Sequence, residues 1–310
     1  MEDNINKNSN LPLLAGLGAA CVCMMFGANA IAIKMSLQGL GVYFSAALRF
    51  TIASSALIIW ALSTKQSLFV PRHKVVQLLT ISVAFSCQLM LQYLGISQTS
   101  ASRSSLILNL QPFFVLFLAH FFIPDDKITL KKIVGIMMGF FGISLVFMET
   151  NAVSTGFRTG DMLVLGGTLI WGGNAVYIKR VFEGFKPLHI ALYPMIVSIP
   201  LTVCGSYFWD TALIIHLDAA VIGSMIYQSL VVATFGYMAW NALLSRYGTV
   251  SLHSYVFVMP ITGVILGGLI LGEPITYKIV FALLFIVAGL LVSYLKQDQL
   301  PPIFSLNRNV

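Results

Sequence analysis

The chain has 310 residues, of which 58% are apolar and only 9% are charged, and its mean hydropathy is +0.88. A soluble domain carries about a quarter charged residues, so this composition excludes a water-soluble globule and predicts an integral membrane protein. The formal net charge of +7 does not indicate nucleic-acid binding, because the basic residues gather in short connections between apolar segments.

Apolar runs of about 20 residues, the length that a helix needs to cross the hydrocarbon core, follow one another along the chain. In order they are residues 12–33, 42–63, 75–97, 104–123, 130–148, 161–182, 188–208, 219–245, 251–271 and 276–295. Because the runs lack the period-two alternation of barrel strands, they predict an all-α membrane protein with ten transmembrane helices. Residues 1–11 and 296–310 are expected to be tails without regular structure, and the long first run argues against a cleaved signal peptide.

The distribution of Lys and Arg predicts the orientation in the membrane. If the N-terminus lies in the cytoplasm, thirteen of the 18 basic residues fall on the cytoplasmic side and one, Arg49, falls within a span. The four on the outer side are Lys34, Arg103, Arg158 and Lys278. The positive-inside rule therefore predicts cytoplasmic termini in a multi-pass protein of a bacterial inner membrane.

Two halves of the chain share a sequence pattern. "FGANAIAIK" (26–34) and "WGGNAVYIK" (171–179) match at five of nine positions, 145 residues apart. Residues 128–147 and 275–294 both begin with Ile-Thr-x-Lys, and Pro112 pairs with Pro260 at an offset of 148. These offsets predict a duplicated five-helix unit, with repeats at 12–148 and 161–295.

An odd number of helices per repeat has a topological consequence. The second copy must enter the membrane from the opposite face, so the two copies are predicted to be inverted. Inverted halves can exchange conformations and open one central site alternately to each side, as in secondary transporters.

Four segments together resemble the EamA-type transporters of the drug/metabolite transporter superfamily. They are "FGANAIAIK", the "ALRF" that contains Arg49, "LILNLQPFFVLFLAHFF" (106–122) and "VMPITGVILGGLILGEPIT" (258–276). The resemblance covers about residues 12–295 and implies ten helices in two EamA repeats. It also implies export or exchange of small metabolites such as amino acids without ATP, and it leaves the substrate open.

Arg49 is the most informative polar residue, because an arginine within a span is costly unless it is paired. No acidic residue lies in the core of a predicted span. Three interpretations remain open: Arg49 bonds helix-end carbonyls, reaches water, or meets an anionic group of a ligand such as a carboxylate.

Other polar side chains lie on helical stripes that must avoid lipid. Each stripe has two possible roles, helix–helix hydrogen bonding or lining a substrate cavity. Ser251, His253 and Tyr255 at the start of span nine form another such stripe. Pro112 and Pro260, expected in mid-span, are predicted as kinks and candidate hinges. The candidate substrate-binding residues are Asn29, Arg49, Gln88, Gln92, Asn109, Asn174, Tyr177, Thr234, Tyr237, Trp240 and Asn241.

The scarcity of intramembrane acids favours exchange or facilitated diffusion over proton coupling. An enzyme would need clustered acids, metal ligands or an activated nucleophile, and the sequence shows no such cluster. An ATP-driven pump would need a GxxxxGK[ST] loop, which does not occur in the sequence. We therefore expect a transporter with no cofactor or metal, a small-molecule substrate, the lipid bilayer and no nucleic acid as partners. A homodimer, a receptor or scaffold, an importer and a lipid head-group flippase remain as alternatives.

Overall fold

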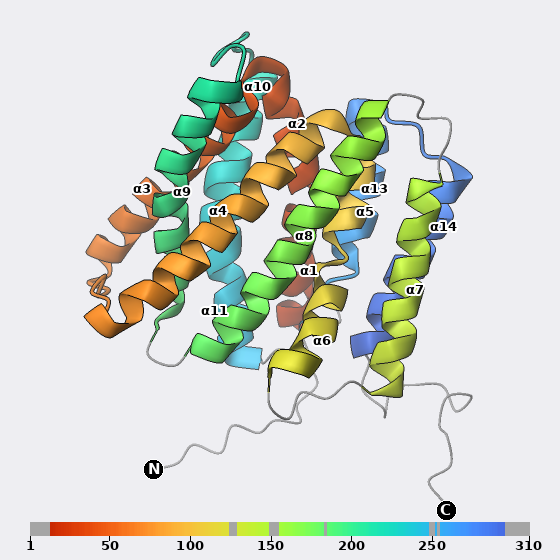
Figure 1. The fold of residues 1–310 in the computed structure, drawn as a ribbon, viewed down its shortest axis with the longest axis horizontal. Coiled ribbons are helices and arrows are strands. Elements are labelled where there is room, and N and C mark those ends of the chain that lie inside the picture. The colour runs from red at the N-terminus through yellow and green to blue at the C-terminus, as the bar shows by residue number, and fades with distance from the viewer. Residues whose placement is uncertain are drawn as a thin grey trace, which may run out of the picture.

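The structure is a computed structural model that describes residues 13–123, 129–148, 155–182, 185–247, 252 and 255–294 (Figure 1). Within these ranges the secondary structure is helical, apart from an isolated bridge between Leu40 and Ile214. The predicted tails, 1–11 and 296–310, lie outside the described residues.

The helices follow the predicted apolar runs closely. In the first repeat they are α1 (Leu13–Gly27), α2 (Asn29–Gly39), α3 (Val42–Ser63), η1 (Arg72–Lys74), α4 (Val75–Gln98), α5 (Ala101–Leu108), α6 (Gln111–Phe122) and α7 (Leu130–Phe147). In the second they are α8 (Thr155–Val181), α9 (Pro187–Trp209), α10 (Ala219–Ile226), the π-helix η2 (Tyr227–Gly236), α11 (Tyr237–Tyr247), α13 (Val258–Leu271) and α14 (Tyr277–Tyr294).

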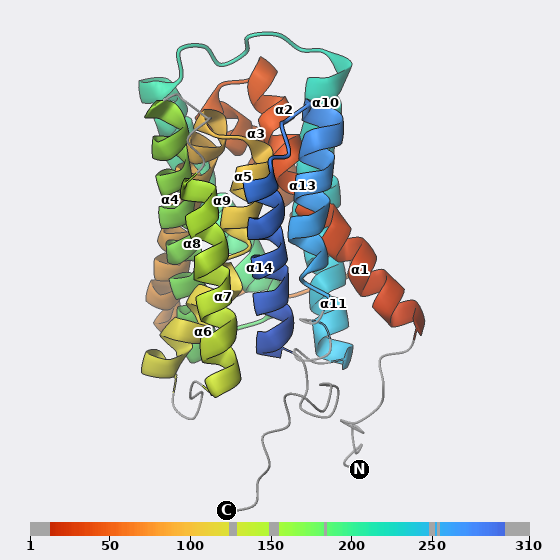
Figure 2. The ribbon, with the colours of Figure 1, turned by 90° about the vertical axis from the view of Figure 1, so that its right-hand side faces the viewer.

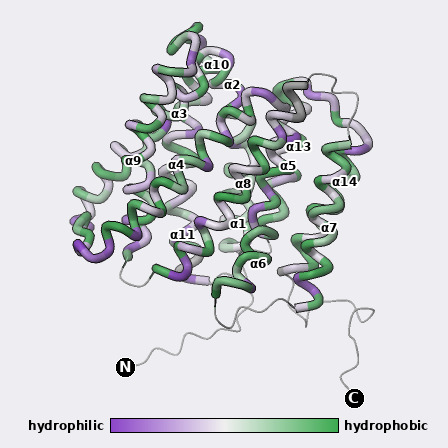
Figure 3. Tube along the Cα trace, viewed as in Figure 1, coloured by the Kyte–Doolittle hydropathy of each residue, from purple (hydrophilic) through white to green (hydrophobic). Residues whose placement is uncertain are grey.

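The exterior of the bundle is apolar. Figure 3 shows hydrophobic residues along the helices, with hydrophilic residues concentrated near helix ends. Large apolar side chains such as Leu14 and Leu269 are 82% and 77% exposed, which in water would be unfavourable and in lipid is not. In the described chain, seven helices are long and apolar enough to cross a membrane, and α13 and residues 277–293 form shorter apolar helices.

Close contacts relate the two repeats by pseudo-symmetry. A Cβ on Gly27 of α1 would lie 2.8 Å from Cβ of Thr262 on α13, and a Cβ on Gly172 of α8 would lie 2.7 Å from Cβ of Phe114 on α6. Gly27 corresponds to Gly172 at the offset of 145, and Phe114 to Thr262 at the offset of 148. The first helix of each repeat (α1 or α8) therefore packs, through the equivalent glycine, against the fourth span of the other repeat (at α13 or α6).

The first helices of the two repeats also run in opposite directions. Lys34, in the middle of α2, and Asp161, in the first third of α8, both bond to Thr99. α2 and the start of α8 therefore lie at the same end of the bundle, opposite to the start of α1 and the end of α14 (Figure 2). This antiparallel arrangement is what inverted repeats require.

The last helices of the repeats, α7 and α14, lie side by side (Figure 2). A Cβ on Gly289 would lie 2.6 Å from the carbonyl oxygen of Gly135, and a Cβ on Gly135 would lie 2.6 Å from that of Gly289. Two glycines facing each other let the helix backbones approach closely, as small residues do in membrane bundles.

Pro112 lies at the centre of the candidate span Ala101–Phe122, as predicted, but both prolines stand in the first turn of a helix. Pro112 is the second residue of α6, after a break in the span at Asn109–Leu110, and Pro260 is the third residue of α13. In the first turn of a helix the missing N–H breaks no helical hydrogen bond. Prolines do lie inside α9, at Pro194 and Pro200. The hinge role of Pro112 and Pro260 stays a prediction.

Candidate functional site

Arg49 lies on α3, 8% exposed, and is the centre of a buried polar cluster. Its Nη1 atom lies 3.4 Å from the hydroxyl oxygen of Tyr93 on α4. The Tyr93 hydroxyl donates to Oε1 of Gln228 at 2.6 Å, and Nε2 of Gln228 lies 3.1 Å from the sulfur of Met225. Nε of Arg49 is buried and has no hydrogen-bond partner. The three helical segments α3, α4 and α10–η2 thus enclose a guanidinium with unused donor capacity.

No carboxylate neutralises Arg49 among the described residues. Four of the eleven acidic residues are described, and each is engaged elsewhere. Asp210, Asp218 and Glu273 accept from backbone N–H groups in the first turns of α3, α10 and α5, and Asp161 pairs with an arginine of α5. Among the described residues, the neighbours of the Arg49 guanidinium are the Tyr93 hydroxyl and the Phe50 ring, whose centroid lies 5.4 Å from Cζ of Arg49.

The segment beside Arg49 is a ten-residue π-helix, η2. The wider π turn is visible in the bond from the Thr234 hydroxyl to the carbonyl of Ser229, five residues earlier, at 3.0 Å. Gln228 and Ser229 are fully buried, Thr234 is 8% exposed, and the Ser229 hydroxyl has no partner. π turns within α-helices often occur at functional sites, because they redirect side chains that an α-helix would place elsewhere.

A second polar group lies between α4 and α8. Gly167 of α8 faces the backbone of Gln88 and the side chain of Gln92, and Nδ2 of Asn174 donates to the carbonyl of Ile81 at 3.2 Å. Oε1 of Gln88, Nε2 of Gln92 and Oδ1 of Asn174 are buried without partners. These amides thus do not satisfy one another, and each has capacity for a further hydrogen bond.

Asn29 and Asn174, the repeat-related pair predicted from the sequence, leave the same side-chain atom without a hydrogen bond. Asn29 begins α2 directly after the turn at Ala28, and its Oδ1 atom is buried without a partner, as is that of Asn174. Two repeat-related amides with the same unsatisfied atom are unusual, since buried polar atoms are normally bonded.

Other predicted site residues are satisfied locally. Nδ2 of Asn109 donates to the carbonyl of Ser105 at 2.7 Å, and Nδ2 of Asn241 donates to the carbonyl of Tyr237 at 2.9 Å. Each of these bonds spans one helical turn, so it stabilises the side chain's own helix. Asn109 thereby caps α5 at the break in the span.

The aromatic candidates lie on α8, on α11 and in the turn before α13. Trp240 on α11 packs edge-on against Phe26 of α1, with ring centroids 6.3 Å apart. Tyr177, Tyr237 and Tyr255 are half-buried. Ser251 and His253, the other polar residues at the start of span nine, lie outside the described residues.

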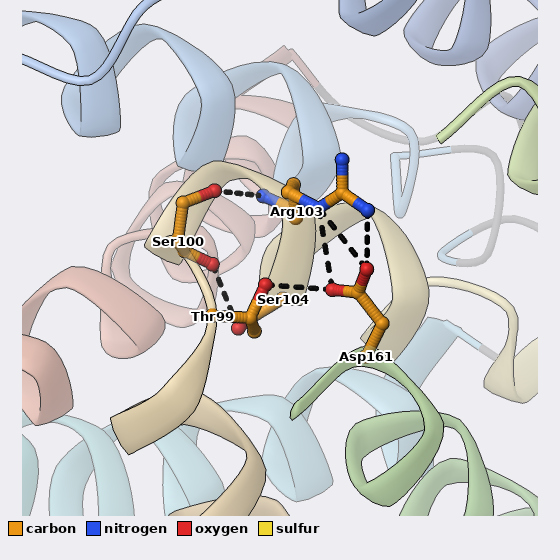
Figure 4. A network of polar contacts seen from close by, with 5 residues as sticks. All are labelled: Thr99, Ser100, Arg103, Ser104 and Asp161. Carbon is orange, nitrogen blue, oxygen red and sulfur yellow. Dashed lines mark hydrogen bonds and ion pairs between the residues drawn. The ribbon is translucent and has the colours of Figure 1, made fainter. Parts of the chain in front are cut away.

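Figure 4 shows a third polar group, at the turn between α4 and α5. Asp161 of α8 accepts from Thr99 at 2.6 Å and forms an ion pair with Arg103 of α5. Arg103 and Asp161 are 3% and 0% exposed. Arg103, predicted on the outer side just before a span, is therefore buried as the third residue of α5, and its partner Asp161 is the first residue of the predicted span 161–182. Mutual neutralisation makes burial possible, which a hydropathy pattern does not reveal.

The same turn is held from two further directions. Nζ of Lys34 donates to the carbonyls of Ile96, Ser97 and Thr99 at 2.6–3.1 Å, which satisfies the C-terminal carbonyls of α4. Glu273, after α13, accepts from the backbone N–H groups of residues 101 and 102 at the start of α5. We call Lys34, Thr99, Arg103, Asp161 and Glu273 the corner network. Both repeats contribute to it.

Tyr93, Gln228 and Ser229 were not among the site residues predicted from the sequence. Gln228 carried a usable signal, since an amide in an otherwise apolar stretch is costly in lipid. Tyr93 carried none, because a tyrosine in a span is common at interfaces and only its contact with Arg49 identifies its role.

An apolar helical bundle with antiparallel repeats and incompletely bonded polar side chains in its interior is the architecture of a multi-pass membrane transport protein. The chain belongs to the EamA-like transporter family, which matches residues 13–148 and 158–295. The family confirms the resemblance seen in the sequence motifs and places the chain among transporters.

Several relatives span nearly the whole chain. The chain is 26% identical over 288 residues to a "Probable amino-acid metabolite efflux pump" of Escherichia coli (strain K12), covering 90% of this chain and 94% of that protein. It is 25% identical over 279 residues to an "Uncharacterized transporter" of Archaeoglobus fulgidus, covering 90% and 98%. A crystal structure with 15% sequence identity has a TM-score of 0.66 over 90% of this chain and 98% of that one, which shows the fold.

Proposed function

We propose that the protein is a ten-span secondary transporter that moves amino acids or similar amphipathic solutes across a bacterial inner membrane, as an exporter or exchanger, by alternating access. The observation that carries this proposal is the repeat-related pair of contacts at Gly27 and Gly172. These contacts join the two halves through equivalent helices, so a change that opens one end has a counterpart that opens the other. The amino-acid class draws support from the Escherichia coli relative's name.

Counterflow tests the transport proposal. The purified protein is reconstituted into proteoliposomes preloaded with an unlabelled amino acid, and uptake of the same labelled amino acid is measured. Labelled sugars and nucleosides serve as comparison solutes. We expect transient accumulation of at least one amino acid, because an exchanger couples its two directions through one site. Counterflow of only sugars or nucleosides would contradict the amino-acid class, and no counterflow of any solute would favour a receptor or scaffold.

Orientation and span number are tested by a tag placed after Val310. With an even number of crossings and the basic excess inside, a reporter at this position should remain unlabelled by a membrane-impermeant reagent in intact cells. A matched reporter in the 210–218 connection should be labelled, because this connection lies at the end of the bundle opposite to the start of α1 and the end of α14. Labelling of the C-terminal tag from outside would contradict the proposed topology.

The amides between α4 and α8 allow a test of whether they bind solute or only contribute to helix packing. Replacing Gln88 by Met keeps the side-chain shape and removes a buried Oε1 that has no partner. We expect an unchanged or higher midpoint of thermal unfolding, because deleting an unsatisfied polar atom is neutral or favourable. We expect the transport rate to fall about 10-fold if the amide contacts solute. A lower thermal midpoint with normal transport per folded protein would assign Gln88 to helix packing.

A further inference from the structure

We propose that Arg49 is an anion-binding site whose occupant is the carboxylate of the transported solute, and that Tyr93 and Gln228 position its guanidinium. This inference rests on the proposed transport function and names the charged group that the site requires. It concerns the cluster formed by α3, α4 and η2.

The charge balance of the cluster requires an anion. Arg49 is more than nine-tenths buried, and every acidic residue in the described ranges is committed to a helix end or to Arg103. A buried cation without a counter-ion is unfavourable by several kcal/mol. Arg103 shows the alternative within the same molecule, because its buried guanidinium is matched by Asp161. Arg49 differs in having no such partner among the described residues.

The hydrogen bonds fix which edge of Arg49 is available. Nη1 faces the Tyr93 hydroxyl, and Tyr93 is itself held by donating to Gln228. The unpartnered Nε belongs to the Nε–Nη2 edge, whose two parallel N–H groups match the two oxygens of a carboxylate. Because Tyr93 donates its only proton to Gln228, its oxygen can only accept from Arg49. The chain Arg49–Tyr93–Gln228 therefore holds the guanidinium in one orientation.

The surroundings of the cluster favour an organic acid over an inorganic anion. The Phe50 ring centroid lies 5.4 Å from Cζ of Arg49, and the Met225 sulfur lies beside both Gln228 and Ser45. A single positive charge with apolar neighbours suits a carboxylate on an apolar body, whereas a phosphate would bring two negative charges to one cation. The buried Ser229 hydroxyl, which has no partner, adds a hydrogen-bonding group on the adjoining segment.

The test compares each labelled amino acid with its own amide, which lacks only the carboxylate charge. Transport into proteoliposomes is measured for the wild-type protein and for Arg49→Gln, Arg49→Lys, Tyr93→Phe and Gln228→Glu. Gln228→Glu is the sharpest variant, because it keeps the side-chain shape and supplies an internal carboxylate that competes with the solute for Arg49. Arg72→Gln, at an exposed arginine of η1, is the matched control for loss of a positive charge.

We expect the wild-type protein to carry the free acid and to discriminate against its amide. Arg49→Gln and Gln228→Glu should each raise KM for the acid about 10- to 100-fold, the range for hydrogen bonds to charged groups. Arg49→Lys should restore part of this loss. Tyr93→Phe should raise KM with little change in kcat, because the charge remains and only its orientation is lost. Arg72→Gln should behave as wild type.

Two results would overturn the inference while leaving transport intact: equal carriage of acid and amide by the wild-type protein, or unchanged KM for the acid in Gln228→Glu with normal thermal stability. If Gln228→Glu does not fold, an unchanged acid-to-amide ratio in Arg49→Lys and Tyr93→Phe would overturn it equally. If the wild-type protein carries no solute at all, the proposed function fails together with this inference.

Discussion

Replacing Asp161 by Asn should strongly destabilise the protein. The substitution leaves Arg103 buried without its counter-ion and turns an amide donor toward a guanidinium donor. Removing one partner of a buried ion pair costs about 3–5 kcal/mol. The midpoint of thermal unfolding in detergent should fall by about 10 °C, since 1 kcal/mol corresponds to a few degrees in a chain of this size.

Two further variants isolate the cause. Asp218→Asn changes an exposed aspartate that caps α10, and Asn caps equally well, so little change is expected. Adding Arg103→Gln to Asp161→Asn removes the orphaned charge and should restore most of the lost stability. If the double variant is as unstable as the single one, helix packing rather than charge pairing stabilises this corner.

Gly263→Leu should separate the two repeats and abolish transport. A Cβ on Gly263 of α13 would overlap the Ser105 side chain of α5 and lie 3.2 Å from the carbonyl oxygen of Gly27. Overpacking of this kind costs about 1–3 kcal/mol, and here the added side chain lies where elements of both halves meet. Leucine is a good helix former, so a loss of helix propensity does not contribute. Thermal unfolding and counterflow are the measurements.

Gly223→Leu is the matched control, because Gly223 is an exposed helical glycine and a Cβ added to it would have nothing within 4 Å. The same substitution there should keep transport and leave the thermal midpoint equal or higher, since leucine stabilises a helix relative to glycine. Normal transport by Gly263→Leu would show that α13 and α5 can separate without loss of function. The close approach of the two repeats at this crossing would then have no role in transport.

The corner network also joins the two repeats. It connects the turn between α4 and α5 to α2, to α8 and to Glu273 after α13. At the offsets of the repeat, Asp161 corresponds to Gly16 and Arg103 to Ser251. The Arg103–Asp161 ion pair therefore has no counterpart at the equivalent positions of the other repeat.

The repeat and the approximate helix bounds could be predicted from the sequence because both are local patterns. Length and apolarity specify a membrane helix without reference to its neighbours. Gly27, Asn29 and their counterparts in the second half were visible as a motif before any contact was known. Family membership followed from the same segments.

The polar interior was predicted only in part, because its meaning depends on partners distant in the chain. Arg49 and the two asparagines could be selected, since polar atoms in a span need an explanation. Whether Arg49 met a carbonyl or a phenol could not be decided, because Tyr93 lies 44 residues away and Gln228 in the other repeat. The pairing of Arg103 with Asp161 could not be predicted for the same reason.

The sequence by itself determined that this chain spans a membrane repeatedly, as two related halves of a transporter family. Hydrophobicity and duplication are properties that each segment carries alone. Only the tertiary structure decided which polar groups neutralise one another and which remain unsatisfied. That distinction depends on distances of a few ångströms between helices whose packing, through glycines and serines, no single segment encodes.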